Sequence, residues 1–305
     1  MTYSIASPNG DLVVYFADAA WMDEVPNESV DLVVTSPPYG VGLRYGVPGA
    51  TPGLNDTGYS GTKGQVERPV MSMEDYGEYL RRLEPVWRET YRKMKPGAYA
   101  ALNVASIHAK SEYFGHSFVL PTSEDTSNFW RFKLEAEYRW RYLWLAMRSN
   151  TNGTDNPPVF FGSYPLPLEG QILRQVEDIL IFRKPRPEGW EMPEERKERR
   201  KLSKLSKEDW RTTFSQVWEF PGARSETSNG TTHPAVFPIE LPLRLIRGYS
   251  CIGDTVLDPF LGTGTTLLAA KTTGRRGIGY EVERTYEPLI ISKLSLGEAS
   301  LGAEW

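Results

Sequence analysis

Short apolar runs alternate along the chain with longer stretches in which apolar residues recur at helical spacing. Runs rich in β-branched and aromatic residues predict strands at 11–17, 31–35, 98–104, 137–146, 176–183, 254–260 and 276–281. Apolar residues three or four positions apart predict helices at 74–94, 126–136, 239–249, 265–273 and 284–296. Strands that alternate with helices indicate an α/β fold, with a mostly parallel, twisted sheet and helices on both faces.

The segment 184–232 departs from this pattern. It is charged and contains proline, and its Lys and Arg residues are interleaved with four aromatic side chains, Trp190, Trp210, Phe214 and Trp218. We therefore divide the chain into 1–183, a candidate insert at 184–232, and 233–305, with the outer parts as two halves of one domain. Acidic residues also occur throughout the segment, so a solvated charged helix is the simpler interpretation of any single residue in it.

Composition narrows the functional classes. The 305 residues carry a formal net charge of −4, which argues against nucleic-acid binding through overall charge and requires a local basic surface instead. Cys251 is the one cysteine, so no intrachain disulfide is possible, and the three histidines lie too far apart for zinc spacing. We expect no metal, no signal peptide and no membrane span, and hence a cytoplasmic protein.

A proline-rich hexamer at 35–40 (TSPPYG) directly follows the predicted strand 31–35. Its two prolines remove two backbone donors and fix two φ angles, so the carbonyls of Ser36 and Pro37 are expected to point out of the strand end. Rigid acceptors of this kind can bind an amino group, and Tyr39 offers an aromatic face for a planar ring. A Pro-Pro pair alone would indicate only a turn, but the complete hexamer favours a binding site.

A glycine-rich sequence at 258–266 (DPFLGTGTT) lies between a predicted strand and a predicted helix. Its glycines permit a tight turn and close approach of a ligand to the helix N-terminus. Asp258 could accept from a ligand amine, and Glu281, at the end of the next strand, could accept from both hydroxyls of a ribose. Leu267 replaces the third glycine of the dinucleotide fingerprint, and the Gly-Lys-Ser/Thr of a phosphate-binding loop is absent.

Together these motifs resemble those of the DNA amino-methyltransferases, which methylate adenine N6 or cytosine N4. Ser36 occupies the variable place of that family's catalytic (Asp/Asn/Ser)-Pro-Pro-(Tyr/Phe) motif. The sequences at 233–238 (HPAVFP) and 17–19 (ADA) resemble two further motifs of the family. The catalytic motif comes first, then the charged segment, then the cofactor motifs near the C-terminus, and this order matches the permuted β group.

The resemblance implies a methyltransferase fold, S-adenosylmethionine as cofactor and double-stranded DNA as partner. It implies a catalytic half at 1–183, a target-recognition insert at 184–232 and a cofactor-binding half at 233–305. Catalytic roles fall on Ser36, Pro37, Pro38 and Tyr39. Cofactor-binding roles fall on Asp18, His233, Pro234, Phe237, Asp258, Phe260, Gly262, Thr263, Gly264, Thr265 and Glu281. Residues 176–180 (VEDIL) resemble a strand that commonly carries a His-Glu pair, but Val176 replaces the His and we assign that position no function.

The implied mechanism is direct methyl transfer to an exocyclic amine of a base flipped out of the duplex. The base would stack on Tyr39, and its amine would donate to the Ser36 side chain and the Pro37 carbonyl. Cys251 has no preceding proline, which disfavours the carbon-5 cytosine mechanism with its cysteine nucleophile. Serine in the variable place accompanies cytosine N4 more often than adenine N6, so we expect a cytosine-N4 enzyme.

Four alternatives remain. The first is an adenine-N6 enzyme with the same fold and cofactor, and the second is an RNA or small-molecule methyltransferase. The third is a DNA-binding protein without turnover, which the filled catalytic motif disfavours. A dinucleotide oxidoreductase explains neither the 35–40 motif nor the 233–238 motif. The family further suggests a restriction-modification system of a prokaryotic cell or phage with a companion endonuclease; the recognition sequence and the oligomeric state, monomer or dimer, are left open.

Overall fold

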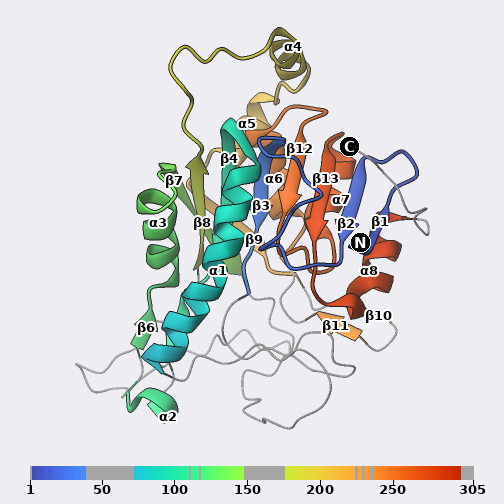
Figure 1. Cartoon of the computed structure of the whole chain (residues 1–305). Coiled ribbons are helices and arrows are strands. Elements are labelled where there is room, and N and C mark those ends of the chain that lie inside the picture. Colours follow the sequence, from blue (N-terminus) through green and yellow to red (C-terminus); the bar gives the residue numbers. More distant parts are fainter. Residues whose placement is uncertain are drawn as a thin grey trace.

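A computed structural model describes residues 2–38, 72–109, 111–116, 118–147, 176–223, 226–228, 231–233 and 237–296. Its centre is a nine-stranded sheet (Figure 1). In sheet order the strands are β1 (Ser4–Ala6), β2 (Leu12–Tyr15), β13 (Arg276–Tyr280), β12 (Thr255–Asp258), β3 (Val30–Thr35), β4 (Met94–Val104), β8 (Val176–Arg183), β7 (Glu137–Met147) and β9 (Val217–Pro221).

The described helices are α1 (Met73–Lys93), α2 (Ser111–Phe114), α3 (Thr122–Phe132), α4 (Glu194–Leu202), α5 (Lys207–Thr213), α6 (Glu240–Tyr249), α7 (Thr265–Thr272), α8 (Glu287–Leu294) and the 3-10 turn η1 (Arg284–Tyr286). Two small antiparallel sheets pair β5 (Ile107–Ala109) with β6 (Phe118–Leu120), and β10 (Glu226–Ser228) with β11 (Thr231–His233).

The sheet is mostly parallel, as the sequence predicted. Strands β2, β13, β12, β3 and β4 run in one direction, and β9 runs parallel to β7. Strand β8 is antiparallel to both β4 and β7, so the two strands predicted at 137–146 and 176–183 form an antiparallel pair. Because the five central strands share a direction, their last residues all lie along one edge of the sheet, which we call the carboxyl edge.

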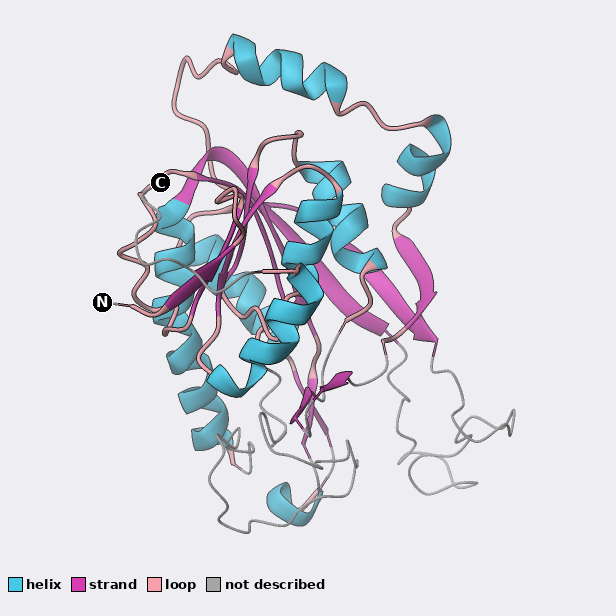
Figure 2. Cartoon of the chain, turned by 90° about the vertical axis from the view of Figure 1, so that its right-hand side faces the viewer, coloured by secondary structure: helices cyan, strands magenta, loops and turns pink. Residues whose placement is uncertain are grey.

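Helices cover both faces of the sheet, and Figure 2 shows them on either side of it. Side chains of α1 and α3 form one buried cluster with Val33 of β3, whereas side chains of α6 and α7 form another with Leu32 and Val34. Successive residues of β3 therefore face opposite cores. This explains why the strand is a continuous apolar run rather than an alternating one.

The segment 184–232, which we predicted as an insert, is not separate throughout. Strand β9 joins the main sheet beside β7, so this part of the segment belongs to the central fold. Helix α4 stands outside the sheet, at the end of the molecule opposite β10 and β11 (Figure 1).

Helix α3 begins at Thr122, four residues before its predicted start. Residues 122–127 are mostly polar, and therefore lack the apolar repeat from which the prediction was made. Glu124 and Asp125 nevertheless lie in the first turn, where acidic side chains interact favourably with the helix dipole. Across the described ranges, the structure has no helix long and apolar enough to cross a membrane.

Candidate active site

The two sequence motifs meet at the carboxyl edge. Strands β3 and β12 are parallel neighbours, and the Thr35 hydroxyl at the end of β3 donates to Asp258 Oδ1 at the end of β12, at 2.6 Å. Ser36 and Pro37 leave the sheet directly after this bond. Residues more than 220 positions apart are thereby fixed side by side, which places the proline motif next to the glycine-rich turn.

Asp258 lies beneath the turn and is fully buried. Besides Thr35, its carboxylate accepts from the Thr266 hydroxyl at 2.6 Å and from the Phe260 backbone N–H at 3.1 Å. Burial raises the pKa of Asp258 to about 6, although these three hydrogen bonds oppose the shift. With no exposed surface in this structure, Asp258 is placed to shape the turn rather than to contact a ligand.

The glycine-rich turn has a backbone that requires glycine. Gly262 has a φ of 57° and Gly264, at the N-cap of α7, a φ of 89°, in the left-handed region where a side chain is unfavourable. A Cβ on Gly264 would also lie 3.4 Å from Leu294 of α8. These constraints hold the turn close to helix α8 and fix the first turn of α7.

Glu281 follows β13 directly and bonds to the same turn. Its Oε2 accepts from the Gly262 backbone N–H at 2.7 Å, and its Oε1 accepts from the Glu283 N–H at 2.8 Å. Burial raises the pKa of Glu281 to about 7. A carboxylate has about four acceptor positions, so two accepted bonds leave capacity for ligand hydroxyls.

Lys293 was not singled out from the sequence, yet it reaches the turn from α8. Its Nζ donates to the Thr263 hydroxyl at 2.7 Å and to the Thr265 hydroxyl at 3.1 Å. The positive charge therefore lies beside two predicted cofactor residues. No motif indicated it, because it is one of several lysines on amphipathic helices and only the tertiary fold gives it this position.

The proline motif is held from two sides. The Ser36 hydroxyl donates to the backbone carbonyl of Asn103, near the end of β4, at 3.0 Å. The Tyr79 hydroxyl of α1 donates to the Pro38 carbonyl at 2.8 Å. These contacts anchor both ends of the described part of the motif; Tyr39 lies outside the described residues.

The remaining predicted residues occupy several places. Asp18 is exposed just beyond β2 and accepts from the Ala20 N–H, while Phe260 packs edge-on against Trp87 of α1. Phe237 is half-buried against the cluster beneath α6. The backbone of His233 belongs to β11, and Pro234 lies outside the described residues.

Comparisons with known proteins identify the family. The DNA methylase family model that covers N6 and N4 methyltransferases matches residues 30–292. The chain belongs to this DNA methylase family.

Two archaeal relatives align with this DNA methylase over most of its length. The Type II methyltransferase M.MjaI of Methanocaldococcus jannaschii is 32% identical over 301 residues, covering 96% of this chain and 94% of the relative. The Type II methyltransferase M.MthZI of Methanothermobacter thermautotrophicus is 35% identical, and the alignment covers 92% of this chain and 76% of the relative. A solved relative is TTHA0409 from Thermus thermophilus, a putative DNA modification methylase whose crystal structure is complexed with S-adenosyl-L-methionine. It is 31% identical in sequence and has a TM-score of 0.66, and the alignment covers 93% of this chain and 92% of TTHA0409.

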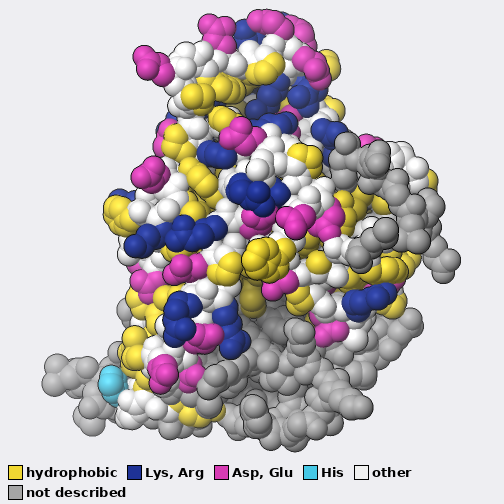
Figure 3. Space-filling model, in the orientation of Figure 1, with side chains coloured by type: hydrophobic (Ala, Val, Ile, Leu, Met, Phe, Trp, Pro, Cys, Tyr) yellow, Lys and Arg dark blue, Asp and Glu magenta, His cyan; other side chains and the backbone are white. Residues whose placement is uncertain are grey.

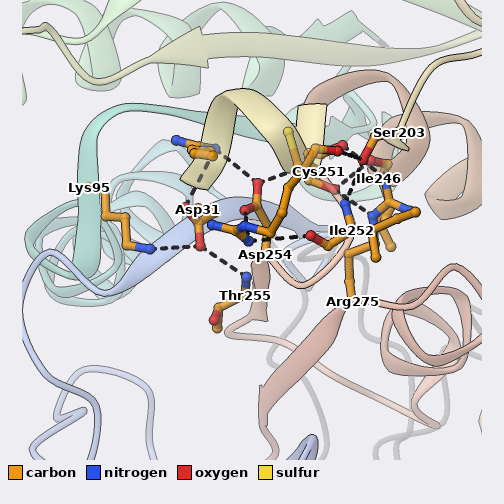
Figure 4. Close-up of polar contacts among 12 residues, drawn as sticks. Asp31, Lys95, Ser203, Ile246, Cys251, Ile252, Asp254, Thr255 and Arg275 are labelled. Atoms are coloured by element: carbon orange, nitrogen blue, oxygen red, sulfur yellow. Dashed lines mark hydrogen bonds and ion pairs between the residues drawn. The ribbon is translucent and has the colours of Figure 1, made fainter. Parts of the chain in front are cut away.

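The opposite, amino edge of the methylase sheet carries a different polar cluster (Figure 4). Asp254, directly before β12, is fully buried and accepts from Arg196 of α4 at 2.9 Å and from Arg199 at 2.8 Å. Arg196 also lies 3.5 Å from Asp31, which in turn accepts from Lys95. The two arginines thus fasten α4 to the amino edge, and this use argues against their contacting DNA bases.

Cys251 belongs to the same amino-edge cluster. It is buried, its backbone N–H donates to Asp254, and burial raises the pKa of its thiol. The thiol therefore lies at the edge opposite Ser36, in an environment that disfavours the thiolate. This agrees with the expectation that the methylase does not use a cysteine nucleophile.

Basic and acidic side chains are intermingled on the α1 face of the methylase (Figure 3). Arg81 and Arg82 pair with Glu78, and Arg88 pairs with Glu84, one helical turn away in each case. Paired charges of this kind are typical of a solvated helix surface. This face therefore gives no evidence of a DNA-binding patch.

Proposed function

We propose that this DNA methyltransferase transfers a methyl group to the N4 amine of a flipped cytosine in duplex DNA, at a specific site and as part of a restriction-modification system. The observation that carries the proposal is the joining of the Ser36 motif to the glycine-rich turn through the bond between Thr35 and Asp258. A motif that can bind an amine and a turn that can bind a methyl donor are thereby placed side by side.

S-adenosylmethionine is the cofactor, and it supplies a methyl group activated by the adjacent sulfonium. The donor set at the carboxyl edge fits this molecule. Glu281 provides acceptors for ribose hydroxyls beside the Gly262 backbone, and Lys293 places a positive charge beside Thr263 and Thr265, where a carboxylate could bind. The left-handed Gly264 leads the turn directly into the N-terminus of α7, where the helix dipole favours a negatively charged group of a ligand.

Ser36 is the residue that we expect to contact the target amine. Because its single proton is donated to the Asn103 carbonyl, its oxygen can only accept in any further hydrogen bond. An amine that donates one N–H to this oxygen is held in a fixed orientation, with its lone pair available for the methyl carbon. Alignment of two reactants in this way accounts for several orders of magnitude in rate without a strong base.

For target binding we propose contacts by described residues together with Tyr39, which lies outside the described residues. We propose that the flipped base stacks on Tyr39 and that the Pro37 carbonyl accepts the second amine proton. Residues of 184–232 beyond α4 remain candidates for DNA contact, and contacts to phosphates would make binding strongly salt-dependent. A companion endonuclease is proposed from the Type II names of the archaeal relatives.

A product assay tests the choice of base. The protein is incubated with duplex DNA of mixed sequence and isotope-labelled S-adenosylmethionine, the DNA is digested to nucleosides, and the labelled nucleoside is identified by mass. Labelled N4-methylcytosine would support the proposal. Labelled N6-methyladenine would keep the family and cofactor but refute the choice of base, and label in RNA alone would refute a DNA target.

A further inference from the structure

The hydrogen bond of Ser36 continues into a second pair of residues that the mechanism above does not use. Asn103 is buried near the end of β4, and its side-chain Nδ2 donates to Glu177 Oε2 at 2.8 Å. Glu177 is the second residue of β8. Because β8 is antiparallel to β4, its first residues lie at the carboxyl edge beside the last residues of β4.

The hydrogen bond between Asn103 and Glu177 has a carboxylate as its acceptor. A carboxylate acceptor makes the hydrogen bond charge-assisted, and such bonds contribute about twice as much as neutral ones. Glu177 is half-buried, so water screens this interaction less than it would a surface contact. The bond fastens the Asn103 side chain to β8, while the backbone carbonyl of the same residue accepts from Ser36.

We propose that Glu177 is a positioning residue for methyl transfer. By holding Asn103, it fixes the carbonyl that accepts the Ser36 proton, and so keeps the Ser36 oxygen directed as an acceptor at the target amine. The inference rests on the proposed role of Ser36. It assigns a function to the position at which the expected His-Glu pair is incomplete, since Glu177 is present although Val176 replaces the His.

The connection is suited to positioning and not to proton transfer. Ser36 donates to the backbone oxygen of Asn103, whereas Glu177 accepts from the side-chain amide of that residue. These two groups share no exchangeable proton, so the bonds form no continuous path from Ser36 to the carboxylate. These two bonds therefore provide no route for the proton that the amine releases on methylation.

Two substitutions distinguish these roles. In E177A the acceptor for Asn103 is lost, and we expect kcat to fall about tenfold, with the Kd for S-adenosylmethionine unchanged, because a small misplacement of a reacting group is costly. In E177Q the side-chain oxygen can still accept from Asn103 Nδ2, so kcat should return to within about twofold of the unsubstituted enzyme. The matched control is D178N, since Asp178 is the next carboxylate on β8 and accepts from Ser123 at 2.5 Å.

A double-mutant cycle tests whether Glu177 acts through Ser36. If it does, E177A should cost little further activity in an S36A background, because the hydroxyl that it positions is gone. The proposal is overturned if E177A keeps full kcat, or if the losses in the cycle are additive. It is also overturned if E177Q is as slow as E177A and loses the acid limb of its pH–rate profile, because Glu177 would then be a proton acceptor.

A parallel fall of melting temperature and cofactor affinity in E177A would likewise refute positioning, in favour of a role in the fold alone. The experiment separates this inference from the proposed function. The base that carries the label is identified with the unsubstituted enzyme, whereas Glu177 is judged from ratios of rates. Methylation at N6 would therefore refute the choice of cytosine and leave the test of Glu177 intact.

Discussion

Two buried aspartates flank the length of β12, Asp254 directly before the strand and Asp258 as its last residue, and they differ in their partners. Asp254 at the amino edge and Asp258 at the carboxyl edge are both fully buried. Asp254 is paired with the guanidinium groups of Arg196 and Arg199, whereas Asp258 accepts from two threonine hydroxyls and one backbone N–H.

The difference separates a structural edge from a chemical one. Guanidinium nitrogens of Arg196 and Arg199 lie 2.9 Å and 2.8 Å from the carboxylate oxygens of Asp254. These two ion pairs compensate the charge of Asp254 and attach α4 to the amino edge. Neutral donors compensate Asp258 less completely, so burial raises its pKa to about 6. The amino edge should therefore govern stability, whereas the carboxyl edge should govern cofactor binding and turnover.

The largest effect is expected at the amino edge, from D254A. This substitution leaves Arg196 and Arg199 without their carboxylate, and removing one partner of a buried ion pair costs about 3–5 kcal/mol. The free energy of unfolding, measured by denaturant titration, should fall by that amount, while kcat well below the melting temperature is retained. The D254N variant keeps the shape and one acceptor and should lose less. A kcat that falls in D254A without a loss of stability would contradict the separation of the two edges.

The next effect is expected at the carboxyl edge, from S36A. Loss of an acceptor aimed at the reacting amine should lower kcat by about a hundredfold, by analogy with the removal of one preorganised hydrogen bond from other active sites. The melting temperature and the Kd for S-adenosylmethionine should stay near those of the unsubstituted enzyme. Full turnover by S36A would refute the role proposed for Ser36.

A smaller effect is expected from K293M. Removing the cation that donates to Thr263 and Thr265 should raise the Kd for S-adenosylmethionine about tenfold, since a hydrogen bond to a charged group contributes about 1.5–3 kcal/mol. Calorimetric titration measures this directly, and kcat at saturating cofactor should change little. The control is K271M. Lys271, on α7, donates to the carbonyl of Leu294, which lies on α8 beside Lys293, and in that bond it does not contact the turn. Equal losses in both variants would show that the effect is a general loosening of α8.

The sequence predicted the central strands and both motifs because each depends on local patterns. Leu32, Val33 and Val34 are apolar since both faces of β3 are covered, and the glycines of the turn are required by its backbone. Tertiary partners carry no such local signal. Nothing near Arg196 or Arg199 in the sequence indicates Asp254, and nothing near Lys293 indicates Thr263.

Two predicted features needed correction or refinement for the same reason. The basic residues of α4 suggested a DNA-facing segment, but only the fold shows that two of them bind buried carboxylates at the amino edge. Asp258 was expected to accept from a ligand amine, but its carboxylate accepts from the hydroxyls of Thr35 and Thr266. Thr35 is distant from Asp258 in sequence, so the local pattern gave no sign of this contact. The sequence motifs thus located the site, whereas the role of each residue in it depended on contacts between residues that are distant in sequence.

The last effect is a dependence on pH that is expected from Glu281, and its direction identifies this residue. The pKa of this carboxyl is raised from an unfolded value of about 4.3 to about 7, so the folded protein holds the proton more tightly than the unfolded chain does. Its contribution to the stability of the cofactor-free protein is therefore present at low pH and lost as the pH rises through this interval.

Ribose hydroxyls donate to the ionised form of Glu281, so the affinity for S-adenosylmethionine should rise over the same interval. Between about pH 5 and pH 8, the melting temperature should thus fall while the cofactor affinity measured by calorimetry rises, so the melting temperature and the Kd both decrease. In E281Q, which cannot ionise, both slopes should flatten; slopes equal to those of the unsubstituted enzyme would remove Glu281 from the cofactor site and would leave the carboxyl edge defined by Ser36 and Lys293 alone.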